Sequence, residues 1–463
     1  MAKCVPGTAF NAMLPPYKSL TASIIRPRHD WRICAIIWAS LVFRNGDCMF
    51  AKSFSVYGVY LLLNAVTALA RSMIFTVAAV YYVTVVGLNP FQLVLVGTVL
   101  MVVILLSEIP TGVVADVYSR RLSIIVGIFL IGLGFAIEGA IPHFAAVLAS
   151  QLIWGVGHTF TSGASEAWIA DELGEQRLGQ VYVRGAQASQ LGALIAIGVS
   201  VGLATIRLNV PIVGAGLLLI ALAVVLLLIM PERGFTPTPR ENRSNWHMAH
   251  QTFQDALGLV RRRPVLLTIL GIAFFFGMAS ETFDRLWEVH FLHNFQFPDL
   301  GRLEPVVWFG IINAGALLLT IAVAEIVRRR LDTNTHIGAV RALLVINALL
   351  MASVIAFGLA GNFAIALTAY WAAYLLRRTD GPIFTAWINQ SLEPQVRATV
   401  LSIHGQVDAI GQIAGGPLFG LIATLTSTRT AMVAAGCVLA PALLLYLRTM
   451  FRRPSEPELA LES

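Results

Sequence analysis

The sequence predicts an all-α integral membrane protein in which twelve transmembrane helices form two six-helix bundles. Composition is the first observation: 57% of the 463 residues are hydrophobic and 12% are charged, whereas about 25% charged residues are usual in soluble domains. The mean hydropathy is correspondingly high, at +0.76. A series of apolar segments near the ~20 residues needed to cross a bilayer is the second observation. The third is an internal repeat.

The apolar segments fall into two groups of six, separated by a polar interval. The first group comprises residues 56–83, 91–109, 122–141, 144–160, 186–206 and 210–230. The second group comprises residues 265–291, 306–326, 342–359, 363–376, 398–423 and 431–447. We therefore interpret 56–230 as an N-terminal bundle, 231–264 as a cytoplasmic linker, 265–447 as a C-terminal bundle and 448–463 as a cytoplasmic tail.

Residues 1–55 precede the first segment, and we expect this extension to lie outside the native fold. We expect residues 1–48 to lie ahead of a natural start at Met49. Its apolar core, residues 33–43, is too short to span a bilayer and lacks the small-residue cleavage site of a signal peptide. The alternative is an anchor that lies on the membrane surface.

The internal repeat appears when the chain is shifted by 219 residues. Residues 143–194 then align without a gap on residues 362–413 and are identical at 11 of 52 positions. The identities include Trp168 with Trp387, two side chains that we expect to anchor the helices at the cytoplasmic membrane interface. The alignment makes the short segment 363–376 the copy of 144–160. A parallel repeat of two six-helix halves is one of the architectures of secondary transporters.

The distribution of Lys and Arg predicts the orientation. Of 32 such residues, only Arg207, Arg302 and Arg429 fall in the loops that we place outside, and Arg71 and Arg285 lie within segments. The other 27 share one side, including Arg377 and Arg378, which we place in the loop after residue 376. Both termini are then cytoplasmic by the positive-inside rule, and a bacterial inner membrane is the expected location.

Several function classes are disfavoured. The basic residues flank apolar segments instead of forming a nucleic-acid-binding patch, and no nucleic-acid-binding motif is present, so we expect no nucleic-acid partner. The four cysteines lack metal-ligand spacing. The nine histidines are scattered and no nucleophile motif is present, which argues against an enzyme. Because there is no phosphate-binding loop for ATP, we expect no cofactor and an ion gradient as the energy source.

One short motif carries the most functional information. Gly112, Asp116 and the pair Arg120-Arg121 stand between the second and third segments, directly after the run Glu108-Ile-Pro-Thr. The motif resembles the cytoplasmic loop between helices 2 and 3 of major facilitator superfamily transporters, and the preceding run resembles their drug-efflux-like branch, which includes drug/proton antiporters and tetracycline exporters. The resemblance implies two six-helix bundles, a monomer, and secondary transport by alternating access.

The resemblance also implies roles for single residues. Gly112 would allow a tight turn, and Asp116 would lie near the start of the third helix and face Arg397 in the other half. Arg120 or Arg121 would pair with an acid at the end of helix 4, either Glu166 or Asp171. Such contacts would form a cytoplasmic gate motif that is closed in one state and open in the other.

The chain departs from the family pattern at three positions. Val117 replaces a common Arg and Ser119 a common Gly, which puts the strength of the gate in doubt. Gln151 stands where drug–proton exchangers often carry an Arg, which weakens the case for proton-coupled efflux. Residues 162–184 nevertheless resemble the helix 4–5 connection of the efflux branch.

Charged residues within the segments form a second set of candidates, since such residues usually mark a partner or a pathway. The seventh segment carries Glu281, Asp284, Arg285 and Glu288 at spacings of three and four, on adjoining parts of one helix face. Arg71 in the first segment and Asp408 in the eleventh could each pair with this cluster. Glu138, near the end of the third segment, fits an interfacial position.

A proton-coupled cycle needs a carboxylate that changes protonation with conformation. Burial favours the neutral form and a neighbouring guanidinium favours the ionised form, so an acid with a breakable Arg partner can switch. Asp284 and Glu281 are the leading candidates and Asp408 is the third. A static network of buried ion pairs is the alternative interpretation.

The sequence thus predicts a secondary active transporter that exports a small amphipathic compound in exchange for protons. Uptake of a nutrient or metabolite, and a nontransporting sensor on the same fold, are the alternatives. The expected partners are a small-molecule substrate, a coupling proton and the lipid bilayer.

Overall fold

The computed structural model describes residues 55–174, 178–236, 264–299, 305–330, 335–391 and 394–451. Within these ranges the chain is helical and contains no strand. The first half contains α2 (Val56–Tyr81), the π-helix η1 (Tyr82–Val86), α3 (Pro90–Val117), α4 (Arg120–Ala140), α5 (Phe144–Thr161), α6 (Ala164–Leu173), α7 (Leu178–Ala204) and α8 (Val210–Ile229). The second half contains α10 (Pro264–Asn294), α11 (Val306–Arg330), α12 (His336–Leu359), α13 (Phe363–Ser391), α14 (Pro394–Leu425), α15 (Thr428–Cys437) and α16 (Ala440–Phe451).

Local sequence signals define several helix ends. Asn89 and Gln92 form a capping box at the start of α3, with Pro90 at its first position. Ser119 caps α4, and Ser427 caps α15. Gly87 ends η1 with a φ of 75°, a conformation that glycine adopts without steric strain.

Ten spans in the described ranges are long and apolar enough to cross a membrane. The last of them combines α15 and α16, which are separated by a short break at residues 438–439. The two predicted segments that are not among the ten correspond to α5 and α13, which the internal repeat aligns with each other. Both are helical and carry polar residues, so they resemble each other in composition as well as in position.

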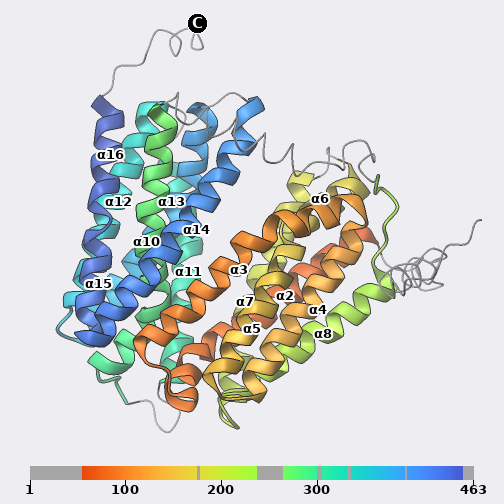
Figure 1. The fold of residues 1–463 in the computed structure, drawn as a ribbon, viewed down its shortest axis with the longest axis horizontal. Coiled ribbons are helices and arrows are strands. Elements are labelled where there is room, and N and C mark those ends of the chain that lie inside the picture. The colour runs from red at the N-terminus through yellow and green to blue at the C-terminus, as the bar shows by residue number, and fades with distance from the viewer. Residues whose placement is uncertain are drawn as a thin grey trace, which may run out of the picture. The chain divides into compact units, whose positions relative to one another are not determined.

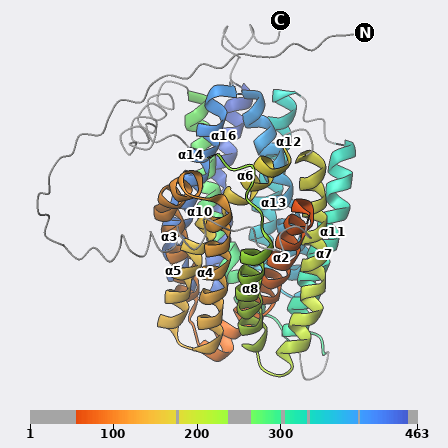
Figure 2. The ribbon, with the colours of Figure 1, turned by 90° about the vertical axis from the view of Figure 1, so that its right-hand side faces the viewer.

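Helices pack mainly within their own half (Figure 1). In the first half, α2 packs against α7 and α8, and α4 packs against α5 and α8. In the second half, α10 packs against α14, and α12 packs against α13 and α15. The halves meet where α3 contacts α14 and α10, and where α11 contacts α7 and α2 (Figure 2).

Small residues allow the close approach at α14. A side chain added at Gly411 or Gly415 would collide with the backbone of α10, whereas one added at Gly416 or Gly420 would meet α3 in the other half. One helix therefore uses two glycine pairs, one for packing within its half and one for packing across the interface. The backbone amide of Phe91 also donates a hydrogen bond of 3.0 Å to Thr424 Oγ1 across this interface.

Several predicted boundaries differ from the structure. The second helix does not end at residue 109 but continues through Pro110 to Val117. The tenth does not end at residue 376, because α13 continues to Ser391 with Arg377 and Arg378 inside the helix. These two arginines were predicted in a cytoplasmic loop, and that prediction was wrong. The N-terminal extension 1–55, except Ser55, most of the linker 231–264 and most of the tail 448–463 lie outside the described residues.

The paired tryptophans of the repeat are core residues, not interfacial anchors. Trp168 is 1% exposed and Trp387 is fully buried. Trp168 donates a hydrogen bond of 2.8 Å from Nε1 to the carbonyl of Pro231, and Trp387 packs against Phe384 and Tyr446.

Candidate functional site

The gate motif is built on the junction between α3 and α4. Gly112 is helical and makes no tight turn, because α3 continues past it. Asp116 lies in the last turn of α3, not at the start of the next helix, and its side chain is 59% exposed. The two predictions about these residues were therefore wrong, and the cap of α4 is Ser119, whose hydroxyl accepts from the amide of Leu122 at 2.9 Å.

The carboxylate at the start of α4 comes from Glu232, which follows α8. Glu232 accepts a hydrogen bond of 2.9 Å from the backbone amide of Arg121 and one of 2.7 Å from the hydroxyl of Ser119. A carboxylate here satisfies an unpaired amide and meets the positive end of the helix dipole. The guanidinium of Arg121 donates to the carbonyl of Leu227 at 2.6 Å. Sequence reasoning missed Glu232, since it is 111 residues from its partner and no local pattern joins the two.

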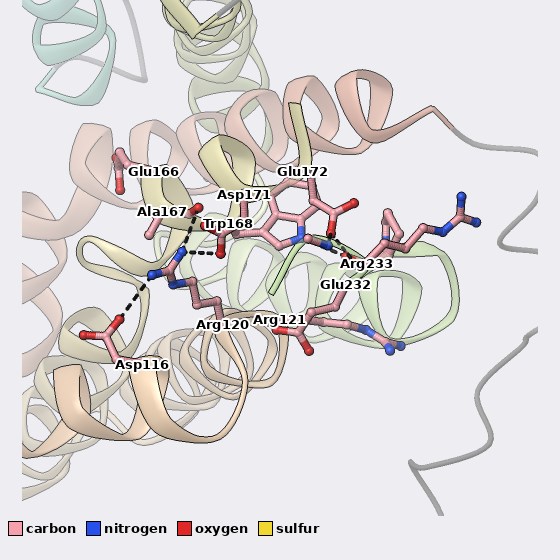
Figure 3. A network of polar contacts seen from close by, with 12 residues as sticks. Asp116, Arg120, Arg121, Glu166, Ala167, Trp168, Asp171, Glu172, Glu232 and Arg233 are labelled. Atoms are coloured by element: carbon pink, nitrogen blue, oxygen red, sulfur yellow. Dashed lines mark hydrogen bonds and ion pairs between the residues drawn. The ribbon is translucent and has the colours of Figure 1, made fainter. Parts of the chain in front are cut away.

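Arg120 is the centre of the gate network (Figure 3). It forms an ion pair with Asp171 of α6 and donates a hydrogen bond of 3.1 Å to the carbonyl of Ala167. Its Nη2 atom lies 3.5 Å from Oδ1 of Asp116. Of the pairs expected from the motif, the structure thus contains Arg120 with Asp171. Glu166 is exposed and takes no part in an ion pair within the described chain. The side chain of Arg397, the expected partner of Asp116, lies outside the described residues.

Helix α6 is fixed to the segment that follows α8. Glu172 accepts hydrogen bonds from the backbone amides of Arg233 and Gly234, the latter at 2.8 Å. With the bond from Trp168 to Pro231, these contacts hold residues 231–234 against α6. Part of the predicted linker therefore belongs to the base of the first half, beside the gate motif (Figure 3).

The predicted cluster on α10 divides into two ion pairs. Glu281 and Arg285 pair with each other at 3.1 Å, and their side chains are 3% and 19% exposed. They pack against Gly97 of α3, where a methyl group would overlap both of them. This pair therefore sits where the two halves meet, next to a residue that has no side chain.

Asp284 pairs with Arg377 of α13, a residue that the sequence pattern places in a loop. Arg377 contacts both carboxylate oxygens, with 2.8 Å between its Nη2 and Asp284 Oδ2. Its guanidinium also lies over the rings of Phe276 and Phe283. The Asp284 side chain is 54% exposed, so other protein groups cover only about half of this carboxylate between α10 and α13.

Arg71 and Asp408 do not pair with the α10 cluster, contrary to expectation. Asp408 accepts from Gln412 of its own helix at 2.7 Å. Arg71 is exposed and forms no ion pair with any described residue. Glu288 is partly buried near Arg285 and Asp284. Neither of the two groups expected to balance charge therefore forms an ion pair with the cluster within the described residues.

Glu138 was predicted to be interfacial, and that prediction was wrong. Its side chain is fully buried and accepts hydrogen bonds from Tyr82 at 2.6 Å, from Gln151 at 2.9 Å and from Ser150. Its backbone carbonyl accepts from Tyr81 at 2.8 Å. Gln151, one of the positions where the sequence departs from the pattern that it resembles, is thus a partner of this carboxylate.

A second buried acid lies in the other half. Asp380 of α13 is 6% exposed and accepts a hydrogen bond of 2.6 Å from the side-chain amide of Asn347 of α12. It was missed because it follows Arg377 and Arg378 in the supposed loop. No group of three or more His, Cys, Asp or Glu side chains within the described ranges could hold a metal ion.

Comparison with known proteins gives a family-level match. The family model of the Major Facilitator Superfamily matches residues 60–388. YxaM of Bacillus subtilis (strain 168), an uncharacterised MFS-type transporter, is 26% identical over 364 residues, which cover 77% of this chain and 86% of that protein.

Solved structures share the fold. The nucleoside transporter NupG gives a TM-score of 0.69 at 12% identity and covers 86% of this chain and 100% of its own. A POT family transporter in complex with a thioalcohol-conjugated peptide gives a TM-score of 0.66 at 14% identity, and the match covers 86% of this chain and 96% of that transporter. A bacterial homologue of the human lysosomal transporter Spinster, inward-facing and occupied, gives 0.66 at 15% identity, with coverages of 86% and 98%.

Proposed function

The chain belongs to the Major Facilitator Superfamily, and on that premise we propose that it exports a small amphipathic compound in exchange for protons. It is a multi-pass membrane protein of a transporter family, whose two halves move a substrate by alternating access. The direction, the coupling ion and the kind of substrate are our proposal. So are a monomeric state, a bacterial inner membrane and cytoplasmic termini, for which the support is the placement of Lys and Arg.

The observation that carries proton coupling is the pair of Asp284 with Arg377. It joins α10 to α13 in the middle of the second half, and Asp284 is 54% exposed. The proposal places this uncovered part of the carboxylate in the water-filled transport pathway, where it can take up a proton. Protonation removes the charge that holds Arg377, and the guanidinium then becomes available to other groups. This makes the pair a switch that can respond to both a proton and a substrate.

The contacts between the halves support alternating access. The contacts described between α3 and α14 lie near Phe91 and Thr424, at one end of both helices. The gate motif lies at the opposite end of α3, where Arg120 is bound within the first half to Asp171 and to the carbonyl of Ala167. This pattern fits a state that is closed at the first end and open at the gate end.

The test measures proton movement in proteoliposomes that hold a pH-sensitive dye. Lipophilic cations, antibiotics and metabolites are added in turn to wild type, to Asp284→Asn and to the matched control Glu108→Gln, which removes an exposed carboxylate from α3. We expect a compound-triggered proton flux in wild type and in the control, and its loss in Asp284→Asn. Flux that survives in Asp284→Asn would move the coupling to Glu281 or Asp408.

Direction is decided in the same vesicles with a labelled compound. A proton gradient that drives accumulation in inside-out vesicles indicates export, and accumulation in right-side-out vesicles indicates uptake, the alternative function. Proton and compound flux both absent across the panel would contradict coupled transport and favour a nontransporting protein.

A further inference from the structure

Glu138 of α4 is a buried carboxyl group that the proposed coupling does not use. It is fully buried and forms no ion pair with any described residue. The guanidinium that acts on it electrostatically belongs to Arg285 of α10, which is bonded to Glu281 at 3.1 Å. A buried carboxylate without a cationic partner is unfavourable, and such a group is usually neutralised by a proton. The hydrogen bonds around Glu138 decide whether there is a place for one.

Neutral groups surround both oxygens of this carboxyl group. Tyr82 of η1 donates to Oε1 at 2.6 Å, and Gln151 of α5 donates from Nε2 to Oε2 at 2.9 Å. The hydroxyl of Ser150, also on α5, is bonded to Oε2 as well. The backbone carbonyl of Glu138 accepts from Tyr81 of α2 at 2.8 Å. The residue therefore joins α2, η1 and α5 to α4.

The hydroxyl of Ser150 carries one hydrogen but has two acceptors. Its Oγ lies 2.8 Å from the backbone carbonyl of Val147 and within hydrogen-bond distance of Glu138 Oε2. Gln151 Nε2 gives one hydrogen to Glu138 and lies 3.1 Å from Ser150 Oγ, which can accept the other. One of the two bonds between Ser150 and its acceptors therefore lacks a hydrogen, unless Glu138 carries it.

A proton on Oε2 of Glu138 completes this set of hydrogen bonds. The carboxylic acid then donates to Ser150, Ser150 donates to Val147, and Oε1 still accepts from Tyr82. Rotating the Gln151 amide would bring its oxygen to Glu138 and Ser150, and that arrangement also requires a hydrogen on the carboxyl group. The hydrogen bonds thus favour the acid over the carboxylate in both orientations of the amide.

We infer that Glu138 is a proton-binding site of the first half, separate from the coupling site proposed at Asp284, and that its carboxylic acid donates to Ser150 in the described arrangement. The ligand is the proton itself, because the carboxyl group is fully buried. The acid fastens η1 and α5 to α4 through its two oxygens. Folding of the first half is therefore coupled to the uptake of a proton.

The other titratable groups near Glu138 leave it as the carboxyl group on which this proton resides. Tyr81 and Tyr82 both donate to the residue. Helix α8, which packs against α4, contains no titratable residue, and His158 of α5 lies about two turns beyond the donors. The ion pairs that join α3 and α6 to α4 involve Arg120, at the opposite end of α4.

Infrared spectroscopy of the full chain in nanodiscs tests the protonation state directly. The carbonyl stretch of a carboxylic acid is separate from the bands of a carboxylate, and glutamate labelled with a heavy carbon isotope at its carboxyl group distinguishes Glu from Asp. At neutral pH we expect a carboxylic acid band that wild type contains and Glu138→Gln lacks. Glu108→Gln, which removes an exposed carboxylate from α3, is the matched control and should keep the band.

A second variant assigns the band to this site. Tyr82→Phe removes the hydroxyl that donates to Oε1 of Glu138, so the carbonyl stretch should move to higher frequency while the acid remains protonated. This variant also decides the question should Glu138→Gln fail to fold, since an acid band that does not move would overturn the inference.

The pH dependence of stability is an independent measurement. Because the folded chain holds a proton that the unfolded chain releases at neutral pH, folding of wild type should take up about one proton more than folding of Glu138→Gln. The free energy of unfolding of wild type should therefore fall relative to that of the variant as the pH is raised. The amide of the variant can still donate to Ser150 and accept from Tyr82.

An ionised Glu138 would overturn the inference. The difference between wild type and Glu138→Gln would then contain carboxylate bands only, and the two free energies of unfolding would change with pH in parallel. These measurements need no transported compound, so they are separate from the coupling assay. Proton flux that survives in Asp284→Asn would contradict coupling at Asp284 and leave the proton site intact, whereas a missing acid band would contradict the proton site and leave the coupling intact.

Discussion

Gly97 lies at a contact between the two halves that leaves no room for a side chain. In α3 it faces the Glu281–Arg285 pair of α10, and a methyl group on Gly97 would overlap the carboxylate of Glu281 and the guanidinium of Arg285. Glu281 is 3% exposed and the pair is closed by a bond of 3.1 Å, so there is little room for either side chain to move away. Gly97→Ala should therefore push α3 and α10 apart.

The size of the effect follows from overpacking. Inserting a methyl group into a well-packed contact usually costs about 1–3 kcal/mol. Only the arrangement in which α3 touches α10 is destabilised, so the cost shifts the equilibrium between the two arrangements. A difference of this size changes their ratio by roughly 5- to 150-fold. The expected result is a larger population that is open at the Phe91–Thr424 end.

Distances between spin labels measure that population. Labels at Val85→Cys and Leu425→Cys report on this end in the two halves, since both positions are exposed. The native cysteines are first replaced by serine. We expect Gly97→Ala to gain a longer distance that is minor in the parent protein.

Gly198→Ala on α7 is the matched control, because a side chain at Gly198 meets nothing within 4 Å. The reasoning would be refuted if Gly97→Ala and Gly198→Ala gave the same distance distribution. A double variant gives a further check. Adding Gly97→Ala to Glu281→Ala should cost less than adding it to the parent, because one of the two colliding groups is already gone.

Two further predictions concern carboxylates that sequence reasoning misjudged or missed. Glu138→Ala should lower the free energy of unfolding by on the order of 3 kcal/mol, because it leaves buried donors unsatisfied. The thermal midpoint in detergent measures this loss, and Glu108→Ala, which removes an exposed carboxylate, is the control. Equal midpoints for the two variants would contradict the prediction. Glu232→Ala should destabilise the start of α4 by about 1 kcal/mol, because the Arg121 amide in the first turn and the hydroxyl of the cap Ser119 both lose their carboxylate partner. Hydrogen exchange at the amide of Arg121 should then become faster, and an unchanged rate would rule out this role of Glu232.

Hydropathy was sufficient to predict the helices, because a chain in a bilayer must satisfy its backbone within each span. Ten spans meet the criterion of length and apolar character, and the two weaker segments are those that the internal repeat pairs with each other. The pair of Arg120 with Asp171 could be anticipated because the motif supplies both its basic residues and the region of the acid. Local patterns thus predicted the architecture and one ion pair of the gate.

Arg377 and Arg378 could not be placed from the same signals. The positive-inside rule assigns a pair of arginines after an apolar segment to a loop, and it makes no allowance for a partner on another helix. Here Asp284, 93 residues away in sequence, accepts both hydrogen bonds from Arg377 and keeps it within α13. The internal repeat did indicate that the helix continues, because its gap-free alignment extends well beyond residue 376 and aligns Trp387 with Trp168.

Glu138 was misjudged for a related reason. A carboxylate near the end of a helix is assigned to the interface when its neighbours in sequence are the only guide. Its hydrogen-bond donors belong to η1 and α5, and their convergence is a property of the packed bundle. Buried acids therefore need the tertiary structure before they can be distinguished from surface ones.

Asp116 is the part of the gate that can change partner most easily. It lies at the end of α3, where the negative end of the helix dipole disfavours a carboxylate. Its side chain is 59% exposed, and it approaches Arg120 only to 3.5 Å, whereas Arg120 holds Asp171 more closely. An exposed pair of this kind contributes about 0–1 kcal/mol, so breaking the contact between Asp116 and Arg120 costs little and leaves Arg120 bound to Asp171. The start of α14, at Pro394, carries the positive end of a helix dipole on the other half. Closure of the gate end would therefore transfer Asp116 from an unfavourable helix end to a favourable one.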